Sequence, residues 1–228
     1  TGGSGIVIVR YLGSAASTSG TVSSGTGTAT GYTLQKFTPT GNNTLTLNAL
    51  SATFSGTISG AGSFTANPTS SGKFNLTGTN TYAGATTISG GTFQVSGAGS
   101  LGSGNYAGAI VNAGSFLYSS SANQTLSGAI TGVGGLQKDT SVISKLLLSG
   151  TNDYSGGTNI NAGVLNVGSG SALGTSGAIS FGGGTLQYSA NNTADYSARF
   201  STAASQVYSV DTNGQNVTWA SGLTSSDG

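Results

Sequence analysis

The 228-residue chain contains no cysteine, methionine, histidine or glutamate. Without cysteine there is no disulfide, thiolate nucleophile or cysteine-based metal site, and without histidine there is no ordinary Ser/His/Asp triad. The longest unbroken apolar run, Ile6–Val9, is far shorter than the roughly 20 residues that a membrane-spanning helix needs. We therefore expect no disulfide, no metal or cofactor, and no membrane insertion of this segment.

Charge is also scarce, because only 5% of the residues are charged and the net charge is +1. Soluble domains usually carry about a quarter charged residues, which keep the molecules apart, so this composition predicts self-association, either head to tail or lateral. Six scattered cations cannot form a basic stripe, which argues against nucleic-acid partners and against electrostatic docking to membranes. The low net charge and recurring apolar runs likewise argue against disorder, despite 41 glycines.

A 72-residue stretch occurs twice, which is the most informative feature of the sequence. The segment Leu76–Gly84 recurs as Leu148–Gly156. The matching positions are apolar, glycine or small polar residues, and no catalytic side-chain type recurs. The repeat positions that we expect to matter structurally are Asn80 and Asn152, Tyr82 and Tyr154, Gly84 and Gly156, and Ile88 and Ile160. A fixed period of this kind is typical of a stacked, quasi-one-dimensional architecture.

Short alternating strands separated by glycine-rich corners fill the repeated region, without sustained helical periodicity. They predict an all-β coil that turns after every strand. With about 18–24 residues per coil, each repeat would contain three or four coils. We expect the apolar residues of one copy to face inward, with their counterparts stacked on them further along, like on like: Leu76, Ile88, Phe93, Val95, Leu101 and Ile110, then Leu148, Ile160, Leu165, Val167, Leu173 and Ile179.

The beginning of the chain differs from the rest. Ile6–Tyr11 is predicted to be a buried strand, Gly13–Gly31 a linker, and Tyr32–Phe37 and Thr44–Leu47 alternating strands. The predicted division is 1–24 for the first strand and linker, 25–53 for the lead-in strands, 54–125 and 126–197 for the two repeats, and 198–228 for an incomplete third repeat. Because the chain opens at Thr1 without a signal peptide, we expect a processed or internal piece of a longer protein.

Both copies of the repeated unit read Leu-x-Gly-Thr-Asn-x-Tyr-x-Gly-x-Thr-x-Ile-x-x-Gly-x-(Phe/Leu)-x-Val, followed by Leu101-Gly102 in the first copy and Leu173-Gly174 in the second. This unit closely resembles the autotransporter-associated β-strand repeat, also called the passenger-associated transport repeat, over roughly residues 54–187. The resemblance implies a right-handed parallel β-helix (β-solenoid) that is extracellular or on the bacterial cell surface. The opening Gly2–Tyr11 resembles the closing strand of a glycine-rich extracellular domain.

Residues that could carry chemistry are few and scattered. A polysaccharide-cleaving β-helix needs clustered carboxylates, whereas the acids are isolated in the sequence. The segment Asp211–Asn216 spaces oxygen ligands like a calcium loop but lacks the later bidentate acid, so an Asx-stabilised hairpin turn is favoured. The repeat-equivalent Lys73 and Lys145 have no paired aspartate for an isopeptide bond. The five acids are Asp139, Asp153, Asp195, Asp211 and Asp227.

Two repeated polar positions remain as site candidates. Asn80 and Asn152 are expected to hydrogen-bond the backbone of an adjacent coil. Tyr82 and Tyr154 are expected to cover the coil corner, or alternatively to form an aromatic row that stacks sugars. Trp219 is expected to pack in the core or at an end of the coil.

The sequence favours a structural component of a bacterial extracellular fibre, stalk or matrix, with head-to-tail polymerisation as a specific hypothesis. An adhesin-type module that binds glycans or host surface proteins is the alternative. A polysaccharide-active enzyme is a remote alternative, so we expect no enzymatic activity, no catalytic residue and no cofactor.

Overall fold

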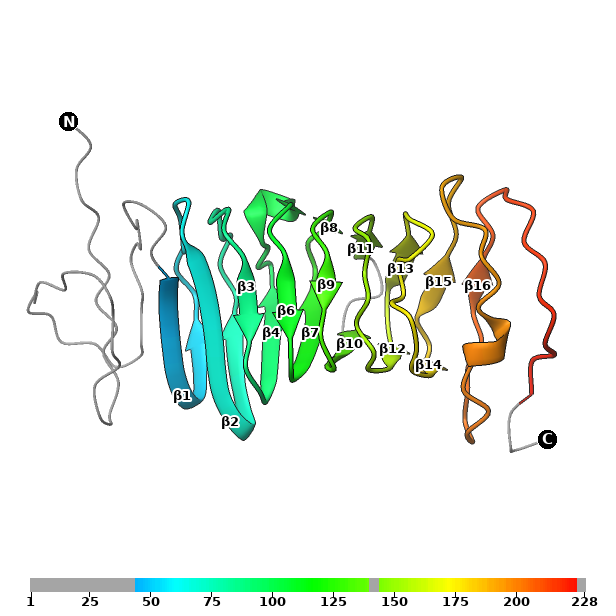
Figure 1. Cartoon of the computed structure of the whole chain (residues 1–228), viewed down its shortest axis with the longest axis horizontal. Coiled ribbons are helices and arrows are strands. Elements are labelled where there is room, and N and C mark those ends of the chain that lie inside the picture. Colours follow the sequence, from blue (N-terminus) through cyan, green and yellow to red (C-terminus); the bar gives the residue numbers. More distant parts are fainter. Residues whose placement is uncertain (1–43, 140–143, 225–228) are drawn as a thin grey trace, which may run out of the picture.

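The protein is an elongated rod built from stacked β-coils (Figure 1). Its structure is a computed structural model that describes residues 44–139 and 144–224. The predicted strands at Ile6–Tyr11 and Tyr32–Phe37, the linker between them and the resemblance of Gly2–Tyr11 lie outside the described residues. The remaining part forms a β-solenoid of about eight turns, as the repeat predicted.

The described residues form two long strands, β1 and β2, followed by short strands, with two single 3₁₀ turns and no α-helix. The 3₁₀ turns are Gly102–Gly104 and Ser197–Arg199. The strands are β1 Thr44–Phe54, β2 Ser63–Leu76, β3 Thr86–Ile88, β4 Thr92–Gly97, β5 Asn105–Tyr106, β6 Ile110–Asn112, β7 Ser115–Ser120, β8 Gln124–Leu126, β9 Ile130–Thr131, β10 Gly135–Lys138, β11 Lys145–Leu148, β12 Thr158–Ile160, β13 Val164–Val167, β14 Ile179–Phe181, β15 Thr185–Gln187 and β16 Val210–Asp211.

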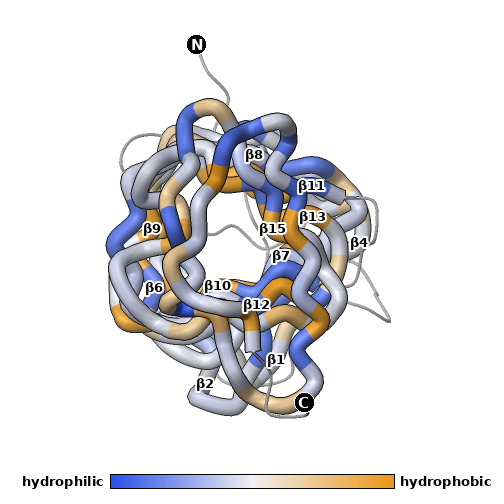
Figure 2. Tube along the Cα trace, turned by 90° about the vertical axis from the view of Figure 1, so that its right-hand side faces the viewer, coloured by the Kyte–Doolittle hydropathy of each residue, from blue (hydrophilic) through white to orange (hydrophobic). Residues whose placement is uncertain are grey.

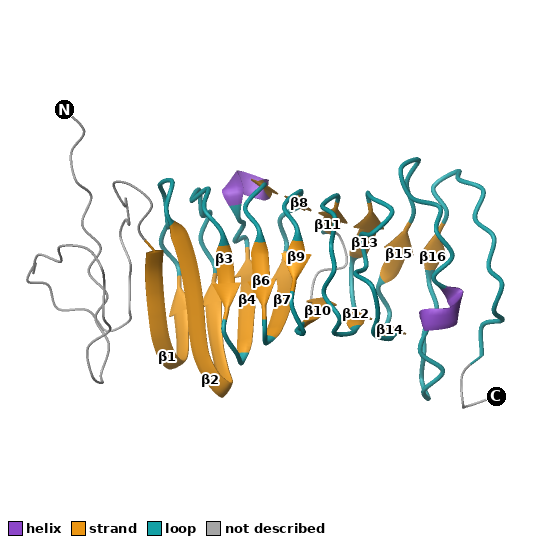
Figure 3. Cartoon of the chain, viewed as in Figure 1, coloured by secondary structure: helices purple, strands orange, loops and turns teal. Residues whose placement is uncertain are grey.

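Each coil runs over three faces, which together form two parallel sheets (Figure 3). Face 1 consists of β3, β6 and β9; face 2 of β4, β7, β10, β12 and β14; and face 3 of β5, β8, β11, β13, β15 and β16. Faces 1 and 2 belong to one ten-stranded sheet because the long strand β2 pairs with β3 through its first half and with β4 through its second half. Face 3 is a separate six-stranded sheet.

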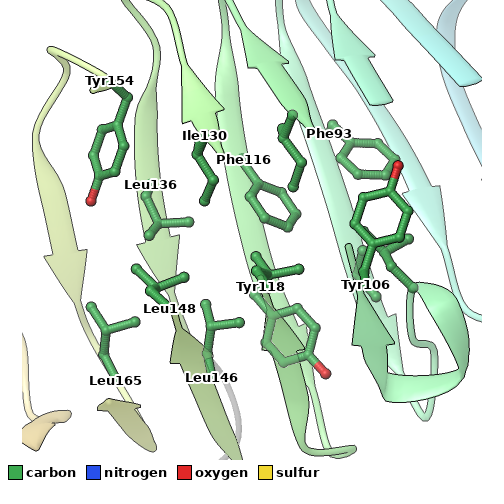
Figure 4. Packing of buried hydrophobic residues seen from close by; sticks show 14 of the residues in the cluster. Phe93, Tyr106, Phe116, Tyr118, Ile130, Leu136, Leu146, Leu148, Tyr154 and Leu165 are labelled. Carbon is green, nitrogen blue, oxygen red and sulfur yellow. The ribbon is translucent and has the colours of Figure 1, made fainter. Parts of the chain in front are cut away.

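Hydrophilic and hydrophobic residues alternate along the trace of the coils (Figure 2), and apolar side chains fill the interior of the rod (Figure 4). In β11, for example, Lys145 is exposed while Leu146 and Leu148 are buried, and Figure 4 shows these leucines beside Leu165 of the next coil. Every residue of the predicted inward set is buried, which confirms that part of the prediction. Burial of a leucine or phenylalanine contributes about 1.5–3 kcal/mol, so the column is the main source of stability.

Glycine is required where successive coils approach each other at a corner. A Cβ added to Gly78 would lie 2.2 Å from the carbonyl oxygen of Gly56, and one added to Gly150 would lie 2.2 Å from that of Gly128. No heavier side chain fits at that distance. The Leu-x-Gly spacing of the repeat therefore reflects the contact between coils.

The two copies of the repeat do not stack like on like, which corrects the sequence-based expectation. The residues directly above Leu76 are Val95, Tyr118 and, three coils up, Lys138. Leu148 lies ten residues beyond Lys138 and belongs to the other sheet. Seventy-two residues thus span three coils and one further face, because coil lengths differ: paired residues are 19 apart between β2 and β4 but 24 apart between β3 and β6.

Candidate functional site at the repeat corners

The repeated asparagines join three successive coils at a corner. Asn80 accepts a hydrogen bond from the backbone N–H of Ile58 in the coil below (2.9 Å) and donates to the carbonyl of Ser100 in the coil above (3.2 Å). Asn152 repeats this arrangement with Ile130 (2.8 Å) and with the carbonyl of Ala172 (2.7 Å). Both side chains are buried, and each supplies partners for backbone groups that the corner leaves outside the sheet ladders.

In the first copy the repeated tyrosine begins a chain of buried hydroxyl groups. Tyr82 shares a hydrogen bond with Thr86 (2.6 Å), and Thr86 shares another with Tyr106 of the next coil (2.8 Å). Tyr106 in turn donates to the carbonyl of Gly84. Burial raises the pKa of Tyr82 and, to about 12, that of Tyr106. All three hydroxyls therefore stay protonated at neutral pH and act as hydrogen-bonding groups rather than as bases.

The second copy contains a shorter form of the same contact. The Tyr154 hydroxyl shares a hydrogen bond with Thr158 (2.8 Å), and burial raises the pKa of Tyr154 to about 12. The exposed fractions of Tyr82 and Tyr154 are 1% and 0%. Both rings thus cover the corner from inside, and neither has a face on the surface that could stack a sugar.

The glycine and isoleucine positions of the repeat also have equivalent roles in the two copies. A Cβ on Gly84 would lie 2.4 Å from the Gly62 carbonyl oxygen, and one on Gly156 would lie 2.4 Å from that of Gly134. Ile88 and Ile160 are fully buried and belong to the core cluster. These positions define how closely the coils stack and present no reactive group.

Lys138 is a buried cation that the sequence did not indicate. Its Nζ donates to Ser144 Oγ at 2.8 Å and lies 5.7 Å from the centre of the Tyr118 ring. Burial lowers the pKa of the Lys138 ammonium to about 8, and the neighbouring Asp139 carboxylate opposes this shift. One feature of the sequence pointed to its burial. Lys138 corresponds to Ala66 of the first copy, and it occupies an inward-facing position in the alternation of β10.

Two further side chains perform the corner function without any repeat motif. Gln124 pairs with both backbone groups of Leu101 in the coil below, accepting from its N–H (2.8 Å) and donating to its carbonyl (3.0 Å). Arg199 donates to carbonyl oxygens of the loop that precedes β14, in the coil below. These carbonyls belong to Leu173, Gly174, Ser176 and Gly177.

Asp195 and Asp211 each accept a hydrogen bond within a turn and another from a neighbouring coil. Asp211 accepts from the N–H of Asn213 (2.8 Å) and forms an Asx turn, but β16 pairs in parallel with β15, so this turn does not close a hairpin. Asp195 accepts from the N–H groups of Ser197 and Ala220 (2.8 Å each). Hydrogen bonds from the Ser197 side chain and from these two N–H groups lower the pKa of the Asp195 carboxyl, and hydrogen bonds from the Gln187 side chain and then from the Asn213 N–H lower that of Asp211. Trp219 is half-buried, donates to the Tyr188 hydroxyl (3.3 Å) and contacts Phe200 edge-on.

Within residues 44–139 and 144–224 no three histidine, cysteine or acidic side chains come together as they would around a metal ion. In the same part of the chain no helix is long and apolar enough to cross a membrane. The polar groups that the corners bring together are buried and paired either with backbone groups or with each other. Chemically, this arrangement ties one coil to the next.

Two segments match the family model of the passenger-associated-transport-repeat, residues 69–95 and 144–167. Each segment forms one closed coil: Lys73 in the first strand of one match pairs with Thr92 in its last, and Lys145 pairs with Val164 in the other. The chain therefore carries two passenger-associated transport repeats, and repeat and solenoid together fit an autotransporter passenger domain. No curated protein and no solved structure matched the chain.

Proposed function

We propose that this chain is a load-bearing segment of a secreted or surface-attached bacterial fibre, stalk or matrix, without enzymatic activity. The observation that carries the proposal is the continuity of bonding along the rod. Parallel strand ladders run through both sheets, and the asparagines join three coils at a time. A rod bonded in this way resists bending and stretching without disulfides.

The surface supports a role in self-association. Most outward positions on face 1 carry small uncharged side chains, and the register aligns Thr65, Thr87, Val111 and Thr131 in one row. Little electrostatic repulsion opposes the approach of a second rod to such a face. Association of copies, end to end or side by side, is therefore part of the proposal.

Electron microscopy of the material in its native preparation tests the structural role. Fibres or meshes with a regular axial repeat are expected, whereas isolated short rods at high protein concentration would contradict it. Sedimentation of the purified chain provides the quantitative arm. A Thr87→Lys/Thr131→Lys variant should shift the association to higher concentration and leave the circular dichroism spectrum unchanged.

A second candidate function, binding of glycans or host proteins, is favoured by one observation. On face 3 the side chains of buried Asn166, half-buried Gln187 and exposed Asp211 form a row, in which Asn166 donates to Gln187 and Gln187 donates to Asp211 (2.8 Å each). Rows of amides and carboxylates suit the hydroxyl groups of sugars. A glycan array distinguishes the candidates: selective binding that Gln187→Ala abolishes would support the binding module, and an empty array would leave the structural role.

A further inference from the structure

We infer that the passenger repeat advances by one face of the solenoid with every copy, so that its exposed corner is displayed on three sides of the rod in turn. The first copy begins with the strand Lys73–Leu76, which pairs with β4 on face 2. The second begins with β11, which pairs with β13 on face 3. Equivalent residues of the two copies therefore lie a third of a turn apart.

The beginning of the third copy supports the same rule independently. Residues Ala220-Ser-Gly222 correspond to Leu148-Ser-Gly150, 72 residues earlier. The Ala220 N–H bonds Asp195, and the Ser221 N–H bonds Ser197 (3.0 Å). Phe200 forms an isolated parallel β-bridge with Ile179, which lies on face 2. Asp195–Ser197 come just before Phe200 in the chain, so they lie at the end of face 1. The chain visits the faces in the order 1, 2, 3, and the three copies begin on faces 2, 3 and 1.

The surface displayed in this way is the outer side of the corner. Around the buried asparagine and tyrosine, three alternate residues of each copy are exposed: Thr79, Thr81 and Ala83 in the first, and Thr151, Asp153 and Ser155 in the second. Each copy advances the repeat by three coils and one face. Three copies therefore advance it by nine coils and three faces, which is ten coils, and return the corner to the side on which it started. At about 4.8 Å per coil this superperiod is about 48 Å.

The consequence concerns how such rods meet a partner. A partner that recognises the repeat corner cannot bind a row of corners from one side, because successive corners point in different directions. Association of rods through this corner rests on the proposed structural function. In that case contacts arise on three sides of each rod. The product is then a three-dimensional mesh rather than a flat ribbon.

The absence of cysteine makes the geometry directly measurable by pairs of spin labels. The repeat pair is Ala83→Cys/Ser155→Cys. The matched control is Ala83→Cys/Ser149→Cys, because the close contacts from Gly84 through Gly108 and Gly128 to Gly150 place Ser149 three coils above Ala83 in the same column. Control labels should lie about 14 Å apart and point the same way. Labels of the repeat pair point outward from different faces and should be clearly further apart.

The experiment is continuous-wave electron paramagnetic resonance on dilute monomer, so its outcome does not depend on fibre formation. Strong dipolar broadening for the control pair and weak broadening for the repeat pair are expected. Equal broadening, or the reverse order, would overturn the inference while leaving the structural role untouched. A second repeat pair, Thr81→Cys/Asp153→Cys, must also show weak broadening, and circular dichroism verifies folding of each variant.

Discussion

The two repeat coils, residues 69–95 and 144–167, have the same corner but different interiors. Asn80 and Asn152 bond the coil below and the coil above in the same way. The interior of the first coil is aromatic, with Phe74 and Phe93 stacked in one column, whereas that of the second is aliphatic, with Leu146 on Leu165. Corners require particular donors and acceptors, because an unpaired backbone group is costly, while interiors require only apolar volume.

The largest effect should come from the glycines that both copies place against a carbonyl. Gly78→Ala and Gly150→Ala force a Cβ to 2.2 Å from backbone oxygen, so we expect each to lower the free energy of unfolding by about 3 kcal/mol or more. Urea denaturation measures the loss. Gly170→Ala is the control, because nothing lies within 4 Å of its Cβ position. A neutral Gly150→Ala would show that the coils are further apart than described.

The corner asparagines should come next. Asn80→Ala and Asn152→Ala each leave a buried backbone N–H, that of Ile58 or Ile130, without its partner, at a cost of about 2–3 kcal/mol. Asn152→Ala also removes the donor to the Ala172 carbonyl, whereas the Ser100 carbonyl keeps the backbone N–H of residue 80 (2.8 Å), so the loss at Asn80 should be the smaller one. Losses at both positions in thermal or urea denaturation, with the smaller one at Asn80, would confirm that both corners depend on the asparagine. The exposed Asn159→Ala should change stability by less than about 0.5 kcal/mol. A loss confined to one copy would break the comparison.

Lys138, whose counterpart in the first copy is Ala66, should make the free energy of unfolding depend on pH. Its pKa falls from 10.5 unfolded to about 8 folded, so the unfolded chain binds more protons in between and stability rises with pH across that window. From about pH 8 to pH 9.5 we expect a gain of about 1–2 kcal/mol.

Urea denaturation at both pH values measures this gain, which Lys138→Met should abolish and the exposed Lys73→Met should retain. A gain that survives in Lys138→Met would assign it to another group. The measurement stays below pH 10, because the tyrosines whose folded pKa is raised to about 12 act in the opposite direction: the unfolded chain loses their protons first, and stability falls.

The smallest expected effect is the loss of stability when either tyrosine of the repeat is replaced by phenylalanine, and this loss should differ between the two copies. Tyr154→Phe removes the side-chain partner of the buried Thr158 hydroxyl and should cost about 1–1.5 kcal/mol. Tyr82→Phe should cost less, about 0.5–1 kcal/mol, because Thr86 keeps its hydrogen bond to Tyr106. Thermal denaturation of both variants gives the order. A larger cost at Tyr82 would mean that the hydroxyl chain acts cooperatively.

The sequence predicted the coils, the inward-facing residues and the family because each depends on local patterns. Alternation along Lys145–Leu148 shows which side chains face inward, and Gly78 and Gly150 mark the close corners. The face of the rod on which each copy begins could not be predicted in this way. It depends on the sum of coil lengths, which vary from 19 to 24 residues between paired strands, and similarity between copies carries no information about angular position.

Long-range partners of single residues were equally hidden. Lysine is normally exposed, and nothing near Lys138 in the sequence shows that Tyr118, one coil below, and Ser144 would enclose it. Gln124 replaces the corner asparagine with a longer side chain at a position without a motif. The contacts of Lys138 with Tyr118 and of Gln124 with Leu101 connect residues 20 and 23 positions apart, so only the stacking of coils reveals them.

The central claim, parallel stacking of coils in the described register, is tested most directly by one disulfide in this cysteine-free chain. Thr87 and Val111 are paired neighbours on face 1, within disulfide reach, whereas Thr131 lies one coil further. Thr87→Cys/Val111→Cys should form an intramolecular disulfide nearly completely under mild oxidation, and Thr87→Cys/Thr131→Cys should not. A folded Thr87→Cys/Val111→Cys variant that keeps both thiols free, or cross-linking of the Thr131 pair, would contradict the stacking.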